Sequence, residues 1–194
     1  MTTSAVSICS NALLDVGAQT IASFDEVSDR AVIVANRWES VRDAVLRSHP
    51  WNCAVKRVIL APDVGTPAFD YAYSFALPGD WLRTLQVGEY GEEVDYKTES
   101  GKILAHVTAL RLRYIWKNTE PASYDSMLVE ALTRAMAAAI AYPITQSASL
   151  AELKEQTFRD FMRQTRAVDG QDDPPEQLGD TRLFNARFGP SRNW

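Results

Sequence analysis

Apolar side chains recur at helical spacing near both ends of the chain and at strand spacing in its middle. On residues 29–48 the intervals are four, three and four residues, typical of one face of an amphipathic helix. These residues are Val34, Trp38, Val41 and Val45. The opposite face is charged and is expected to face solvent; it carries Arg30, Arg37, Glu39, Arg42 and Asp43. A first helix is predicted over 4–17, with Ser4 as its N-cap and Gly17 as its stop.

A third helix is predicted over 121–142. Proline suits the first turn of a helix, which places Pro121 at its start. Pro143 is expected to end or kink it. No charged residue lies in 135–144, so this helix is expected to be buried on most sides, and its alanines allow close approach of neighbouring helices.

A fourth helix is predicted over 150–168. Ser149 and Glu152 have the spacing of a capping box, which opens such a helix. The side expected to be buried carries Leu150, Leu153, Phe158, Phe161, Met162 and Thr165. Together the helices predict an antiparallel bundle of about four helices.

Residues 53–117 change to a period of two, which is typical of β strands. The clearest run covers 69–77, where every odd position is aromatic or aliphatic. After a turn at Pro78, the segment 81–87 is expected to return as a strand, and a hairpin is predicted around Glu99-Ser100-Gly101.

The last predicted strand covers 110–117. Its two faces differ, because apolar side chains alternate with basic ones. One side carries Leu110, Leu112, Tyr114 and Trp116, and the other carries Arg111, Arg113 and Lys117. The fold class is therefore α+β, a helical bundle with an antiparallel β insertion over 53–117 and an extended C-terminal arm.

The helix over 29–48 and the β insertion meet at a short junction. Pro50 disfavours helical geometry at His49, so the helix ends there, and His49 is expected to serve as a hydrogen-bonding group at its end. The ring of Trp51 is expected to cover the joint, and its indole N–H needs a partner. The residues assigned to this structural junction are Trp38, Arg42, Pro50 and Trp51.

The chain changes character after a first domain that spans 1–168. Residues 169–180 are acidic and rich in glycine and proline, and are predicted not to fold alone. Residues 181–194 combine apolar and basic side chains, which indicates an arm that docks on a partner. The residues assigned to this docking arm, within 169–194, are Leu183, Phe184, Arg187, Phe188, Arg192 and Trp194.

Composition limits the possible functions. With 20 basic and 25 acidic residues the formal net charge is −5, which argues against a protein whose main work is to grip nucleic acid phosphates. The two cysteines, Cys9 and Cys53, are isolated, so neither a disulfide framework nor a zinc site is expected. The N-terminal segment lacks the features of a signal peptide. The apolar stretch 135–144 is expected to be too short and too weakly hydrophobic to span a bilayer, so no membrane contact is predicted.

Motifs for nucleotide binding, metalloprotease activity and serine hydrolysis are missing from the sequence. The two histidines, His49 and His106, lie on different predicted elements. Glu92, Glu93 and Asp95 form an acidic cluster, and paired carboxylates can cleave glycosidic bonds, but their place in a glycine-containing hairpin tip favours a solvated loop. No catalytic residue, metal ligand or cofactor is predicted.

Short motifs follow one another in a definite order: a helix ending in LLDVGA, a loop SFDE, a second helix, HPWN, the β insertion, FALPGDWLR and two final helices. This order resembles that of the tail tubular protein A family of tailed bacteriophages. The resemblance covers about residues 1–168, which we take here as a connector domain. The residues that carry the resemblance are Asn11, Leu13, Leu14, Gly17, Ala18, Arg42, Asp43, Leu46, Pro50, Trp51, Ala54, Leu77, Pro78, Asp80 and Leu82.

The resemblance implies a structural virion protein at the head-to-tail junction, made in the host cytoplasm. Such a connector, also called an adaptor or gatekeeper, forms a dodecameric ring that binds the portal protein. It continues the channel for double-stranded DNA without sequence-specific binding, and it offers a platform to a downstream nozzle or tail completion protein. The net charge of −5 agrees with a channel past which DNA slides during ejection.

Two alternatives belong to other classes. Some members of the family are described as cell-wall hydrolases, and a carboxylate hydrolase acting on cell wall or exopolysaccharide would use Glu92, Glu93 or Asp95. A DNA-binding module would use Arg111, Arg113 and Lys117 on the last strand, and its binding would depend steeply on salt.

Overall fold

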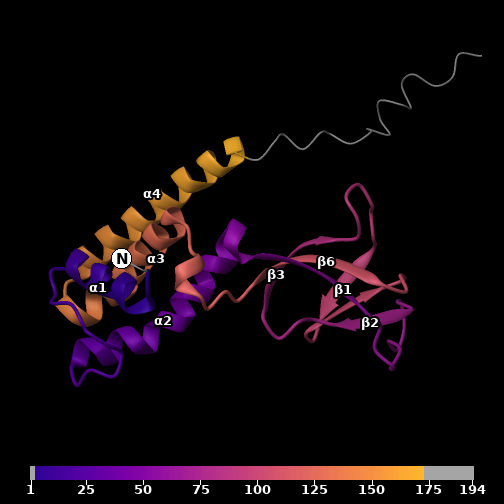
Figure 1. Ribbon diagram of the computed structural model, residues 1–194, viewed down its shortest axis with the longest axis horizontal. Helices are drawn as coiled ribbons and strands as arrows, with labels where there is room; N and C mark the ends of the chain where they lie inside the picture. The colour runs from indigo at the N-terminus through magenta and orange to yellow at the C-terminus, as the bar shows by residue number, and fades with distance from the viewer. Residues whose placement is uncertain (1–2, 173–194) are drawn as a thin grey trace, which may run out of the picture.

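The computed structural model describes residues 3–172, and the side chains of 3–165. Figure 1 shows the helices gathered at one end of an elongated molecule and the strands at the other. The α+β class predicted from the sequence is confirmed. The helices are α1 (Ala5–Asp15), α2 (Asp29–Ser48), α3 (Ser126–Thr145) and α4 (Ala148–Asp172), with single 3₁₀ turns at Asn52–Ala54 and Pro121–Ser123. The strands are β1 (Val55–Leu60), β2 (Tyr73–Ala76), β3 (Trp81–Val87), β4 (Tyr96–Glu99), β5 (Lys102–Ala105) and β6 (Leu110–Trp116).

The bundle is built around α3, which packs against α1, α2 and α4 (Figure 1). Its buried side includes many alanines, which let the neighbouring helices approach closely. By length and mean hydropathy, 1.3 over its most apolar window, α3 is long and apolar enough to cross a bilayer. The expectation that this region is too short and too weakly hydrophobic is therefore corrected. Its central place in the bundle accounts for the apolar composition.

The predicted ends of α1 and α2 agree with the structure to within two residues. Ser4 accepts a hydrogen bond from the backbone N–H of Ser7, as expected of an N-cap. Gly17 has a φ of 79° and donates its N–H to Leu14, while Ala18 donates to Leu13. This arrangement is a Schellman stop, which requires the left-handed backbone that glycine adopts without strain.

The ends of α3 differ from the prediction. Pro121 lies in a separate 3₁₀ turn, and α3 begins at Ser126 because Asp125 accepts a hydrogen bond from Leu128 N at 2.7 Å. Pro143 does not end the helix, which continues to Thr145. Gln146 caps the helix: its backbone is left-handed (φ 54°), and it donates its N–H to Tyr142 O.

The start of α4 also needs correction. Ser147, two residues before the predicted capping residue, accepts a hydrogen bond from Leu150 N at 3.3 Å. Ser149 already lies in the first turn, so the Ser149–Glu152 spacing is not the cap. Leu153, expected to be buried, is 59% exposed.

The β insertion contains two antiparallel three-stranded sheets, β1-β6-β3 and β2-β5-β4. A small core lies between them and includes Phe75, Ile103 and Leu112. The predicted hairpin is confirmed between β4 and β5, where Ser100 and Gly101 both have positive φ. The predicted alternation of β6 is confirmed as well, since Leu110, Leu112 and Tyr114 are all buried.

The long strand predicted over 69–77 is wrong in its first half. Only Tyr73–Ala76 form β2, because the partner strand β5 has just four residues to pair with. Asp70 has a φ of 67°, which interrupts the extended backbone, and Phe69 is 77% exposed. The alternating pattern is real, but without a neighbouring strand an extended segment has no ladder to join.

Candidate functional site

The junction between α2 and β1 is closed by Trp51. The indole is 2% exposed, and its Nε1 donates a hydrogen bond to Val45 O at 3.2 Å. The ring of His49 lies edge-on to it, with centroids 4.7 Å apart. Trp38 is buried farther back in α2, and Pro50 is exposed at the turn that follows the helix. The role predicted for Trp51 is confirmed.

The prediction for Arg42 is wrong in one respect, because the sequence pattern placed this residue on the solvent face of α2. Its side chain is 4% exposed, and its Nε and Nη2 lie 2.9 and 2.8 Å from Asp43 Oδ1. The other oxygen of Asp43 lies 3.1 Å from Lys117 Nζ, just after β6. The helical pattern could not reveal this, because the chain that leaves the β insertion covers Arg42 from outside the helix.

Asn118 holds the chain where it leaves the β insertion, and sequence reasoning missed it. It is 1% exposed, and its Nδ2 donates to Cys53 O at 2.8 Å and Ser123 Oγ at 2.9 Å. Its Oδ1 accepts from Glu120 N at 3.0 Å. Asn118 therefore links the entry of the β insertion to its exit. A single asparagine after a strand gives no signal of this role in the sequence.

Tyr124 and Arg42 are neighbours at the same junction. Tyr124 is 8% exposed and donates its hydroxyl to Asn118 O at 2.6 Å. Burial raises the pKa of Tyr124 to about 12; the nearby charge of Arg42 acts in the opposite direction but is the weaker influence. The tyrosine is therefore held neutral as a hydrogen-bond donor.

Asp80 fixes the turn before β3. Its carboxylate accepts from Lys56 Nζ at 2.8 Å and Tyr114 Oη at 3.0 Å, and its backbone oxygen accepts from Lys117 N at 2.6 Å. Burial by itself would raise the pKa of Asp80, but the hydrogen bonds from Lys56 and Tyr114 outweigh it and lower the pKa below its usual value. Lys56 also lies 3.4 Å from the centroid of the Trp116 ring, a cation–π contact.

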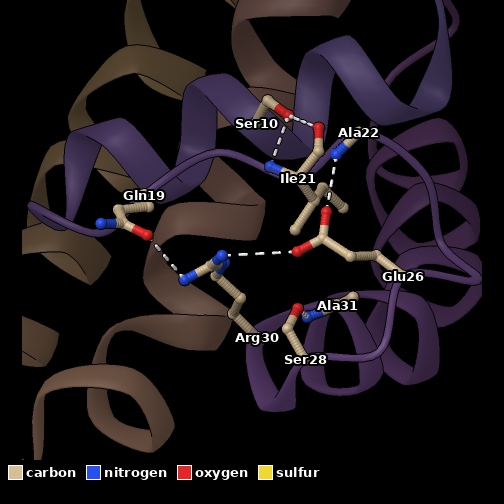
Figure 2. Close-up of polar contacts among 8 residues, drawn as sticks. All are labelled: Ser10, Gln19, Ile21, Ala22, Glu26, Ser28, Arg30 and Ala31. Carbon is tan, nitrogen blue, oxygen red and sulfur yellow. Dashed lines mark hydrogen bonds and ion pairs between the residues drawn. The ribbon is translucent and has the colours of Figure 1, made fainter.

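The loop between α1 and α2 is fixed by a second polar cluster, at the N-terminal end of α2 (Figure 2). Glu26, in the SFDE motif, accepts from Ala22 N at 2.9 Å and pairs with Arg30 at 3.4 Å. Arg30 also donates to Gln19 at 3.1 Å. The hydrogen bond from Ala22 N lowers the pKa of Glu26, and smaller effects of Ser28 and Arg30 act in the same direction. This cluster holds the loop against the bundle.

The carboxylates considered for hydrolysis do not converge on a cleft. Glu92, Glu93 and Asp95 are all exposed on the loop between β3 and β4. Glu92 accepts a hydrogen bond from Glu89 N at 2.8 Å, within its own loop. The two histidines lie apart, with His49 on Trp51 and His106 on Tyr71. Among the described residues, no group of three or more His, Cys, Asp or Glu could hold a metal ion.

The three basic residues of the last strand are divided by the structure. Lys117 lies at the junction, paired with Asp43. Arg111 and Arg113 lie farther along β6 and line a surface groove of about 650 Å³ on the β1-β6-β3 sheet. Arg57 of β1 lines the same groove, a neighbour that the sequence pattern did not indicate. Ile115 separates the two regions, because it packs into the bundle core.

The docking arm predicted over 169–194 lies largely outside the described residues. The structure describes the backbone of α4 to Asp172, beyond the predicted helix end at 168. The assigned arm residues all lie in 173–194 and are not described.

Comparison with protein-family models and with curated proteins found no match. Evidence about function therefore comes from this chain itself. The described residues bring together side chains that hold the helical bundle and the β insertion of this chain together.

Proposed function

We propose that this chain is a subunit of the ring-shaped head-to-tail connector of a tailed bacteriophage. The observation that carries the proposal is the position of the motif residues on which the resemblance rests. Arg42, Asp43, Trp51 and Asp80 all belong to the junction network, where they hold the β insertion against the bundle. Motif residues that set the shape of a subunit suit a protein that works by repeating that shape around a closed ring.

Two further features support a mechanical role. The bundle packs around an alanine-rich central helix, which favours a stiff unit because closely packed interiors deform little. The β insertion projects from one end of this bundle (Figure 1). In the proposed ring, a projecting part of each subunit offers a repeated platform to the downstream tail protein, while the bundles form the wall around the channel.

The charge balance fits the proposed passage of double-stranded DNA. With a net charge of −5, the subunit repels phosphate groups at long range more than it attracts them. The aromatic and basic residues of the docking arm, among them Phe184, Phe188 and Trp194, have the composition of a segment that orders on a partner. We assign that partner as the portal protein, with each arm contributing to attachment of the ring.

The proposal is tested by producing the full chain together with the portal protein of the same phage and imaging the purified complex by electron microscopy. A ring of this chain coaxial with the portal is expected. A matched variant truncated after Asp172 keeps all of α4 and should remain folded by circular dichroism, but attach more weakly. Absence of any ring or portal complex with the full chain would contradict the proposal.

A further inference from the structure

The groove on the β1-β6-β3 sheet carries an excess of positive charge. Three arginines line it, Arg57, Arg111 and Arg113, while Glu89 is the single acidic residue among its lining residues. Glu89 lies 3.0 Å from Arg111 and so offsets one of the three. The chain has a net charge of −5, so the groove is a positively charged surface on an acidic protein.

The arrangement of the arginines is itself unfavourable without a counter-charge. Arg57 on β1 lies directly opposite Arg113 on β6, and like charges in such cross-strand pairs destabilise a sheet. The Nε of Arg113 is buried and has no hydrogen-bond partner among the described residues. An anionic group between the two side chains would relieve the repulsion of this cross-strand pair.

The groove also offers apolar surface and a free strand edge. Ile59 is 66% exposed and the ring of Tyr90 is 68% exposed, and both line the groove. Within residues 3–172, β1 pairs only with β6, so its other edge presents unpaired backbone groups. Arginine, an aromatic ring and a strand edge together favour an extended acidic polypeptide over a small anion.

A segment of matching chemistry follows α4 in the sequence. No basic residue lies between Arg166 and Arg182, whereas this interval holds five acidic residues, Asp169, Asp172, Asp173, Glu176 and Asp180. Pro174 and Pro175 lie in the middle of it, and consecutive prolines favour an extended chain that loses little entropy on binding. Proline rings also pack well on exposed aromatic side chains such as Tyr90.

The chain that follows α4 is long enough to reach the sheet. Met162 and Arg163 of α4 line a surface hollow together with Ser48, the last residue of α2, so α4 passes beside the junction there. Nine more residues to Asp172 add about 13 Å of helix. The eight residues 173–180 extend at most about 26 Å further, which by itself exceeds the roughly 20 Å of β1.

We infer that the arginine groove, formed by Arg57, Arg111, Arg113, Ile59 and Tyr90, binds the acidic segment 173–180 of the same chain. The carboxylates of Asp173 and Glu176 bind the Arg57–Arg113 pair, and the two prolines pack near Tyr90. Docking would hold the start of the arm beside the β insertion and cover the groove. The inference does not depend on ring formation, so its test uses the free subunit.

The first test is a disulfide trap within the full chain. Ile59→Cys combined with Gln177→Cys should cross-link under mild oxidation at a rate independent of protein concentration, scored by intact mass and peptide mapping. The matched control replaces Ile59→Cys by Val64→Cys, an exposed position outside the groove lining, and should react at least about tenfold more slowly. Equal rates for the two pairs would overturn the inference, and a covalent dimer in place of the internal cross-link would assign the segment to a second copy instead.

The second test reverses the charges. Arg57→Glu with Arg113→Glu should slow the internal cross-link about tenfold or more, because each charge-assisted hydrogen bond contributes strongly. Adding Asp173→Lys and Glu176→Lys to the same chain should restore the rate. Arg159→Gln, at an exposed site on α4, is the control and should leave it unchanged.

Arg57→Glu alone, at an exposed position, keeps the test available if the double variant does not fold. If the arginine substitutions slow the internal cross-link and the added lysines do not restore its rate, the inference is overturned. The inference is also overturned if the chain binds a fluorescent DNA duplex and this binding is lost when Arg57 and Arg113 are replaced. The groove would then be assigned to nucleic acid.

Discussion

Lys117, the first residue after β6, lies 3.1 Å from Asp43, in the C-terminal half of α2. The same carboxylate contacts the buried guanidinium of Arg42. One acidic side chain is therefore paired with two cations, one from the helix and one from the chain leaving the β insertion. This contact joins the helical bundle to the β insertion through charge.

Replacing Asp43→Asn is expected to reduce the free energy of unfolding by about 2 kcal/mol, because the buried charge of Arg42 loses its counter-ion. Urea denaturation measures the effect. Asp160→Asn is the matched control, since Asp160 pairs with the exposed Arg163 and should cost less than about 0.5 kcal/mol. A similar loss of unfolding free energy in both variants would contradict the larger contribution expected of the junction pair.

Asn118→Ala is expected to cost about 2 kcal/mol, because it leaves partly buried backbone groups of Cys53 and Glu120 without their partners. Limited proteolysis should then cut first in the segment between β6 and α3. Gln156→Ala removes an exposed hydrogen bond to Asp160 and serves as the control. A cleavage pattern identical to that of the unmodified chain would contradict the role given to Asn118.

Gly17→Ala is expected to destabilise the chain by about 1 kcal/mol, although no atom lies within 4 Å of the added methyl group. The cost arises from the left-handed backbone, with a φ of 79°. Gly65→Ala also has open space around it and lacks a positive φ, so thermal unfolding should show no loss there. The prediction fails if the two substitutions shift the melting temperature equally.

Alkaline pH is expected to weaken the junction. The pKa of Tyr124 is raised to about 12, so the unfolded chain ionises this tyrosine first, near its ordinary value of about 10. Stability is therefore fully present below that value and is lost as the pH rises toward 12. Between pH 8 and 11 Tyr124 accounts for a loss of about 1 kcal/mol, which Tyr124→Phe should remove from the pH dependence.

Denaturant unfolding at the two pH values measures this difference. Tyr142→Phe, at a position that is 53% exposed, is the control and should keep the pH dependence of the unmodified chain. If Tyr124→Phe loses as much stability at high pH as the unmodified chain, the junction is not held by a neutral tyrosine.

Local patterns in the sequence predicted the elements whose signal is contained in a short window. The bounds of α2, the stop at Gly17, the burial of Trp51 and the alternation of β6 all follow from periodicity and capping chemistry. Each depends on residues close in the chain.

The missed features depend on residues distant in sequence. Arg42 is buried because the chain near Lys117 and Tyr124 returns to α2, and Asn118 bonds to Cys53 across 65 positions. The first half of the strand predicted over 69–77 lacked a partner, which no local pattern reveals. The arginine groove likewise needs the β1–β6 register, which places Arg57 opposite Arg113.

Native mass spectrometry of the full chain mixed with its portal protein tests most directly whether this protein works by assembling into a larger machine. The proposed function predicts one complex in which copies of this chain equal the portal subunits in number, as expected for matched dodecameric rings. A chain that stays monomeric beside an intact portal ring at all mixing ratios would contradict it.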